Sequence, residues 1–308
     1  MKPTLILVAS LLATSAFAAP AQLQYRPGSE AQVVRLQSDP ERFPRMMAEA
    51  KAYAEARRAN AIADVRAVGL MVFPAAGSVP GSAGTFFRSD VTLINYDSAS
   101  QDVIFYWMAN NSTSRDLPAL RVTLAPSTVY TFEDFVGTQF ELQGLGAMYA
   151  IPVNGDTTDL NASVDGFSRI WTNQPNATGT VSQPFPATDP FSFYILRSAA
   201  ILGLRHDPSY RTNFGLLNLD DEPHRFRVEF IGSKGLTNQI ELTLQPQTMT
   251  QQGIPAGDYG HLIIRVSSDD TEAWWLTYAS STDNITGDGW VSVGSGILTP
   301  AELDAIER

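Results

Sequence analysis

From Ala67 onward, short hydrophobic runs alternate with clusters of Gly, Pro, Asn, Asp and Ser. Runs such as "DVTLIN" (90–95), "FRVEFI" (226–231) and "HLIIRVS" (261–267) are rich in β-branched and aromatic residues. Runs of this length, separated by turn-forming residues, are typical of the strands of a β-sandwich or a β-barrel. No long amphipathic helix separates them, which argues against a parallel α/β sheet. The pattern therefore predicts an all-β fold.

Residues 38–63 follow a different pattern and consist mainly of strong helix formers. The helix is capped either by Ser38 with Glu41, or by Asp39 with Pro40 as the first helical residue. Its apolar stripe is narrow, so we expect the helix to pack lightly on its neighbour or to act as a spacer, with partner binding as the alternative. The stripe consists of Phe43, Met46, Met47, Ala50, Tyr53 and Ala54.

Two similar stretches, "FRSDVTLIN" (Phe87–Asn95) and "YRTNFGLLN" (Tyr210–Asn218), begin 123 positions apart. Further along, "LRVTLAPST" (120–128) matches "IELTLQPQT" (240–248). Blocks that recur in the same order predict a tandem duplication of one fold, with shorter loops in the second copy. The third matching pair is "PNATGT" (175–180) and "DNITGD" (283–288).

The order of these blocks resembles a group of secreted bacterial proteins with tandem immunoglobulin-like β-sandwich repeats. The shared pieces are the "FRS/TN-x-x-L-x-N" strand, the "L-x-P" strand end and the "DN-x-TGD" turn, and they cover roughly Ala67 to Ser295. The resemblance implies two tandem immunoglobulin-like antiparallel β-sandwich units after a short N-terminal helix. It implies no catalytic residues. The first unit departs from the pattern, because "NQPNATGT" lacks both aspartates of the closing turn.

The first residues read as an export signal: Lys2, then the apolar run "LILVASLLA" (5–13), then a small-residue cleavage site after Ala18. No later stretch is long and apolar enough for a transmembrane helix. We therefore expect a periplasmic or extracellular protein, and the cysteine-free exported chain suggests a bacterium. The predicted segments are a signal peptide (1–18), a polar linker with the helical spacer (19–66), and two β-sandwich units (67–190 and 191–308).

The chain has 308 residues, of which 44% are hydrophobic and 17% charged, so each unit can bury a core. A net charge of −11 argues against nucleic acid or an anionic membrane as partner. With no cysteine, both units must be stable without disulfides.

Five residues are candidates for ligand binding. Arg88 and Arg211 occupy the same position in the two copies, where a guanidinium either binds a carboxylate or sugar ligand or clamps a turn or a carboxylate of its own unit. Trp274 and Trp275 are neighbours in an expected strand, so their side chains should lie on opposite faces of the sheet. An exposed Trp beside Tyr278 would form a stacking platform for a sugar ring.

The turn from Asp283 to Asp288 is a candidate Ca²⁺ site, since it gathers oxygen ligands around two glycines. A glycine-bearing hairpin turn is the alternative. No other cofactor is expected. His206, His224 and His261 are scattered and match no zinc motif, and no nucleophile-elbow motif occurs.

These patterns predict an exported, non-catalytic binding or structural module of the cell envelope or extracellular space, with a protein or glycan partner at the cell surface. The first alternative is a carbohydrate-binding protein that uses an exposed Trp. The second is a hydrolase with a site between the two units, in which a histidine would lie within hydrogen-bond reach of a Ser and a carboxylate.

Overall fold

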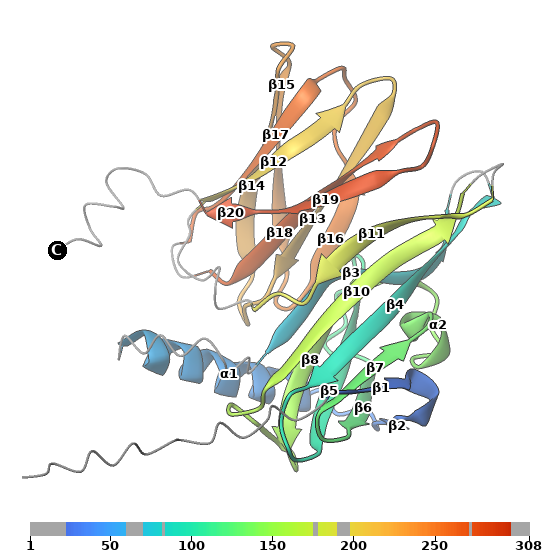
Figure 1. The fold of residues 1–308 in the computed structure, drawn as a ribbon. Coiled ribbons are helices and arrows are strands. Elements are labelled where there is room, and N and C mark those ends of the chain that lie inside the picture. Colours follow the sequence, from blue (N-terminus) through green and yellow to red (C-terminus); the bar gives the residue numbers. More distant parts are fainter. Residues whose placement is uncertain are drawn as a thin grey trace, which may run out of the picture.

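The computed structural model of this protein describes residues 23–59, 70–81, 84–174, 178–189, 198–270 and 273–296 (Figure 1). Strands dominate these residues, so the predicted all-β fold is confirmed. None of the described helices is long and apolar enough to cross a bilayer. The proposed signal peptide (1–18) lies outside the described residues, as does the end of the predicted helix after Ala59.

The strands of the first half form one continuous, strongly bent sheet. Strand β3 causes the bend, because it pairs with β8 over most of its length and with β4 only at its last two residues. The strands are β1 (Gln24–Pro27), β2 (Gln32–Arg35), β3 (Met71–Pro80), β4 (Phe86–Asn95), β5 (Gln101–Ala109), β6 (Ala119–Leu124), β7 (Thr128–Phe132), β8 (Gly144–Asn154), β9 (Thr157–Thr158), β10 (Val164–Asn173) and β11 (Thr180–Pro186).

The second half consists of two separate sheets that face each other across a hydrophobic core. One sheet has the order β15-β14-β17-β12-β20, and the other has the order β16-β13-β18-β19. The strands are β12 (Ser198–His206), β13 (Tyr210–Asn218), β14 (His224–Gly232), β15 (Thr237–Leu244), β16 (Met249–Gly253), β17 (Gly260–Ser268), β18 (Trp275–Asp283), β19 (Gly289–Val293) and β20 (Ser295–Gly296).

The two halves share a strand order. In the first half, β6-β5-β8-β3 are neighbours in that order, and β7-β4-β10-β11 form the facing layer. These orders correspond strand for strand to β15-β14-β17-β12 and β16-β13-β18-β19. The stretches that match in sequence therefore lie on corresponding strands, with "FRSDVTLIN" in β4 and "YRTNFGLLN" in β13.

The segment that we expected to be a polar linker contributes two strands to the first half. Strand β1 pairs in parallel with β7, and β2 pairs antiparallel with β6. Both are four residues long and mostly exposed, and backbone hydrogen bonds at the sheet edges hold them. Short edge strands of this kind show little hydrophobic alternation, which explains why the sequence pattern missed them. The turn between them contains a short 3₁₀ helix (Gly28–Glu30).

The predicted helix is present as α1 (Arg42–Ala59), and a second, one-turn helix, α2 (Phe135–Thr138), follows β7. Neither predicted N-cap forms as expected, because the helix begins at Arg42 and Pro40 precedes it, although the Oδ1 of Asp39 accepts a hydrogen bond from the Glu41 amide, 3.2 Å away. Ser38 instead donates to Asp116.

Candidate functional site

Helix α1 is a central packing element, which corrects the expectation of light packing. Phe43, Met46, Met47 and Ala50 are all at most 5% exposed. The Phe43 ring lies 4.6 Å from that of Tyr106 and 4.8 Å from that of Tyr149, measured between centroids. The narrow stripe is sufficient because large aromatic residues of the first half close around it.

The same core continues into the second half. Leu217, Leu219, Met249, Trp274, Leu276 and Tyr278 of the second half join the cluster that contains the buried face of α1. Figure 1 shows α1 beside the first half and below the second. One hydrophobic core therefore joins α1 and both halves, so their relative placement is set by burial of apolar surface.

Polar contacts tie α1 to each half. Glu49 of α1 accepts a hydrogen bond from the Thr158 amide of the first half, at 3.1 Å. Two residues along, Lys51 forms a 3.0 Å ion pair with Asp220 of the second half, and its ammonium lies 5.5 Å from the Trp274 ring centroid. The helix thus bridges the two halves through side chains only two positions apart.

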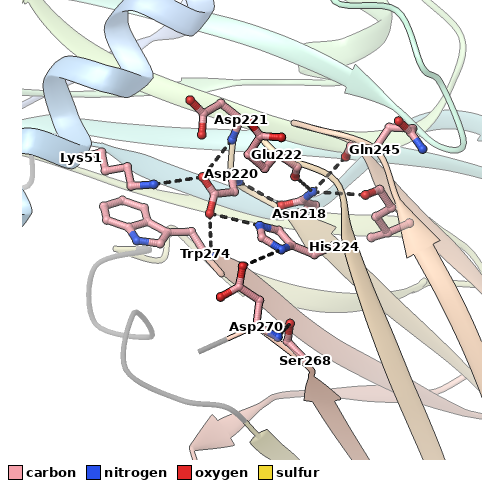
Figure 2. A network of polar contacts seen from close by, with 11 residues as sticks. Lys51, Asn218, Asp220, Asp221, Glu222, His224, Gln245, Ser268, Asp270 and Trp274 are labelled. Atoms are coloured by element: carbon pink, nitrogen blue, oxygen red, sulfur yellow. Dashed lines mark hydrogen bonds and ion pairs between the residues drawn. The ribbon is translucent and has the colours of Figure 1, made fainter. Parts of the chain in front are cut away.

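Asp220 is the centre of a buried polar network (Figure 2). Its side chain is 6% exposed, and it contacts Lys51 through Oδ1 and His224 through Oδ2, the latter at 3.2 Å. The other ring nitrogen of His224 lies 3.4 Å from Asp270. Burial by itself raises the pKa of Asp220, but hydrogen bonds from Asp221 and Lys51 outweigh it and lower that pKa to about 2. Asp220 is therefore ionised at neutral pH.

Among the described residues, the three histidines make contacts other than the serine hydrogen bond that the hydrolase alternative requires. Both ring nitrogens of His224 face carboxylates, so neither is left to accept a proton from a serine. The Nδ1 of His206 accepts a hydrogen bond from the Thr212 amide, and burial lowers the pKa of this imidazole. His261 contacts Ser233 through its backbone amide. No hydrogen bond from these imidazoles to a serine side chain occurs within the part of the chain that the structure describes.

Neither Trp274 nor Trp275 is exposed, so neither forms the expected stacking platform for a sugar ring. Trp274 and Trp275 do lie on opposite faces, as predicted, but both are buried. Trp274 belongs to the core under α1, and Trp275 belongs to the core between the two sheets of the second half. Tyr278 is also buried, and its ring packs against Phe185 of the first half. Contact between the two halves covers the face of the sheet on which we expected an exposed aromatic platform.

The two repeated arginines make contacts within their own halves. The guanidinium of Arg88 lies 3.9 Å from Asp134 and packs near the rings of Phe86 and Trp171. Arg211 donates a 3.0 Å hydrogen bond to Asn284 in the turn between β18 and β19. These contacts fit the alternative in which each arginine clamps part of its own half. Arg211 also lines a cavity.

A cavity of about 320 Å³ lies between the two halves, and Arg211 is part of its lining. Its second-half wall is polar and includes Arg211, Asn213, Gln251, Ser280 and Thr282. Most of the first-half wall is apolar and includes Val79, Phe87, Leu145, Ile170 and Phe185. Of the described lining residues, Arg211 is the single charged one.

Cross-half hydrogen bonds hold the cavity walls in place. Asn110 of the first half accepts from the Gln251 amide at 2.7 Å and donates back to the Gln251 carbonyl at 3.3 Å. The Oε1 of Gln251 accepts from the buried Tyr278 hydroxyl. Gln183 donates to Thr282 across the same interface, at 3.4 Å. These hydrogen bonds fix the position of the two cavity walls relative to each other.

The Asp283–Asp288 turn lies at the end of β18. Asp283 Oδ1 accepts hydrogen bonds from the amides of Ile285 and Thr286, at 2.7 and 3.1 Å, and these bonds lower the pKa of Asp283. Within the described ranges no three His, Asp or Glu side chains cluster as metal ligands. The hairpin alternative accounts for the Asp283 contacts, and Ca²⁺ binding at this turn stays a prediction.

Sequence reasoning missed both the cavity and the Asp220 network. The i, i+4 spacing of Asp220 and His224 is the one local signal of that network. Asp220 lies in a turn that looked like solvated loop, and His224 is the first residue of β14. Lys51 and Asp270 join from distant parts of the chain, so no spacing pattern indicates them. The cavity exists because two halves pack together, and no motif describes it.

Comparison with known proteins assigns no family. No family model matches this chain, and no curated protein matches it. One solved structure that it resembles is titled "Crystal Structure of Thermotoga maritima 1070", with 12% sequence identity and a TM-score of 0.29. That match covers 33% of this chain and 95% of the other.

Proposed function

We propose that this protein is an exported, non-catalytic binding module of two tandem immunoglobulin-like β-sandwich units, and that the cavity between them binds a small organic acid. The observation that carries the proposal is the lining of that cavity. Its described residues form one apolar wall and one polar wall, and Arg211 is the single charged side chain among them.

This lining fits a carboxylate attached to an apolar body. A guanidinium has five N–H donors, and the bond from Arg211 to Asn284 uses one of them, so others remain for a carboxylate. The side chains of Phe87, Leu145 and Ile170 offer an apolar wall opposite. Burial of the apolar body would add affinity in proportion to the area removed from water.

The lining favours binding over hydrolysis. No imidazole and no carboxylate occurs among the described lining residues, so the hydroxyls of Ser280 and Thr282 have no general base beside them in the cavity. The corresponding strand orders of the two halves and the matching sequence blocks support the tandem arrangement. The N-terminal signal pattern supports export.

The test is thermal unfolding with a panel of small carboxylic acids and, for each acid, the neutral primary amide of the same carbon skeleton. We expect acids with an apolar body to raise the melting temperature and the amides not to, because a ligand of the native state stabilises it, by about 2.7 kcal/mol at a hundredfold excess over Kd. Arg211→Gln should abolish the rise.

Arg88→Gln is the matched control, because Arg88 holds the same place in the first half and does not line the cavity. It should leave the rise intact. If no acid on the panel shifts the melting temperature, or if both variants lose the shift equally, the proposal is wrong.

A further inference from the structure

One sheet edge is covered in the first half, whereas in the second half no described strand covers the corresponding edge. Strand β6 pairs with β5 on one side and with β2 on the other. Its counterpart β15 pairs with β14, and no described residue pairs with its other side. Every second backbone N–H and C=O along this edge therefore lacks a strand partner in the described chain.

The missing strand leaves part of the second core incompletely covered. In β6, Leu120, Val122 and Leu124 are at most 1% exposed, and Val33 of β2 packs on the same core opposite Val122. The aligned residues of β15 are Ile240, Leu242 and Leu244. Ile240 and Leu242 are only partly buried, although both pack on the second core. Covering them would remove further apolar surface from water.

The edge of β15 has few of the usual devices that prevent strand addition. Its eight residues, "TNQIELTL", contain no Pro, Gly or Lys, and β15 shows no bulge in its pairing with β14. Glu241 is its one charged residue, and it forms an ion pair with Arg225 on β14. Charge therefore does not keep a second strand away.

We propose that β15 pairs antiparallel with β15 of a second copy of this chain, forming a two-fold symmetric dimer with one sheet continuous across both copies. A second copy fits because this pairing covers both free edges at once and closes the assembly. An edge strand from another part of a neighbouring copy would pair with β15 through a heterologous contact, which must either be repeated reciprocally or build a chain of copies, whereas one β15–β15 contact closes the dimer. Pairing of two eight-residue strands would also cover Ile240 and Leu242, as β2 covers Val122.

The first measurement is the mass of the full exported chain in solution by light scattering, over a dilution series. We expect a dimer that dissociates on dilution. Glu241→Lys should shift it to monomer at all concentrations, because an edge lysine opposes strand addition and the ion pair with Arg225 is lost. The melting temperature of this variant shows whether the fold is retained.

The absence of cysteine allows a position-specific test. Single cysteines Gln239→Cys, Glu241→Cys and Thr243→Cys place a thiol on the outward face of β15, and Thr123→Cys is the matched control on β6, whose edge β2 already covers. Mild oxidation should cross-link the β15 variants, most at the position nearest the two-fold axis.

Three results would overturn the proposal. One is a monomer at the highest soluble concentration. The second is a dimer whose β15 cysteines cross-link no better than Thr123→Cys, since the contact would then lie elsewhere. The third is a mass that grows beyond two copies, which would indicate head-to-tail strand exchange.

Discussion

Asn95 and Asn218 make the same hydrogen bonds in the two halves. The Nδ2 of Asn95 donates to the carbonyls of Ala99, Leu124 and Ala125, at 2.8, 3.4 and 3.1 Å. Asn218 donates to the corresponding carbonyls of the second half, and both Oδ1 atoms accept from the amide two residues on, at 3.0 Å. Those carbonyls belong to Glu222, Leu244 and Gln245.

This asparagine joins two neighbouring turns, which explains why the chain repeats it at the end of β4 and β13. Its side-chain amide pairs with backbone groups as a neighbouring strand would: the two N–H donors bind carbonyls and the oxygen accepts from a backbone amide. In the second half, the backbone amide that donates a hydrogen bond to the Oδ1 of Asn218 belongs to Asp220. The repeated structural residue therefore also positions the centre of the polar network.

Asn95→Ala and Asn218→Ala should each lower the free energy of unfolding by about 2 kcal/mol, because buried carbonyls lose their donor. Urea denaturation measures the change. Asn154→Ala, at the exposed end of β8, should stay within about 0.5 kcal/mol of the wild type. Equal effects at Asn218 and Asn154 would contradict the buried hydrogen-bond assignment.

Lys51→Met should lower the free energy of unfolding by about 1–2 kcal/mol, since it leaves the buried Asp220 carboxylate without its cation. The half-exposed position of Lys51 moderates the loss. Lys234→Met is the control, because its pair with Asp258 lies at the surface, and it should change stability by less than about 0.5 kcal/mol. Limited proteolysis should cut α1 faster in Lys51→Met than in the wild type or in Lys234→Met.

Acid should remove the contribution of Asp220. Its pKa is about 2 in the folded protein, against about 3.9 for an ordinary unfolded Asp. A lowered folded pKa means that the stabilisation is present above about pH 4 and is lost as the pH falls through about 2. Unfolding curves of the wild type and Asp220→Asn should therefore converge below pH 4, and a constant gap down to pH 2 would exclude this linkage.

Trp274→Ala and Trp275→Ala should each cost about 3–5 kcal/mol of stability, because both side chains fill cores. The conservative changes Trp274→Phe and Trp275→Phe should recover much of that loss. Denaturant unfolding of the four variants measures this. A Trp→Ala variant with unchanged stability would indicate an exposed side chain and would revive the sugar-platform hypothesis.

Asp283→Ala should lower the melting temperature in a buffer with chelator, since the turn amides of Ile285 and Thr286 lose their acceptor. Thermal unfolding with and without Ca²⁺ separates this role from ion binding. A Ca²⁺-dependent rise in melting temperature that Asp283→Ala abolishes would establish an ion site at this turn.

Local patterns predicted the secondary structure well. The alternating run "FRVEFI" lies in β14, and the helix formers after Ser38 form α1. Both were predictable because strand and helix periodicities depend on residues that are neighbours in the sequence. The matching blocks lie on corresponding strands, since similar local sequence forms similar local structure. The short strands β1 and β2 escaped prediction because their stability comes from the edges of β7 and β6.

The sequence by itself determined the all-β class, most strand positions, the helix and the correspondence between the two halves. Only the tertiary structure decided which faces are covered: that α1 is buried, that both tryptophans are core residues, and that Lys51 meets Asp220. It also created the cavity at Arg211. The physical reason is that periodicity tells which side of an element is apolar, whereas burial, paired charges and cavities depend on residues that lie far apart in the chain and meet only when the two halves pack together.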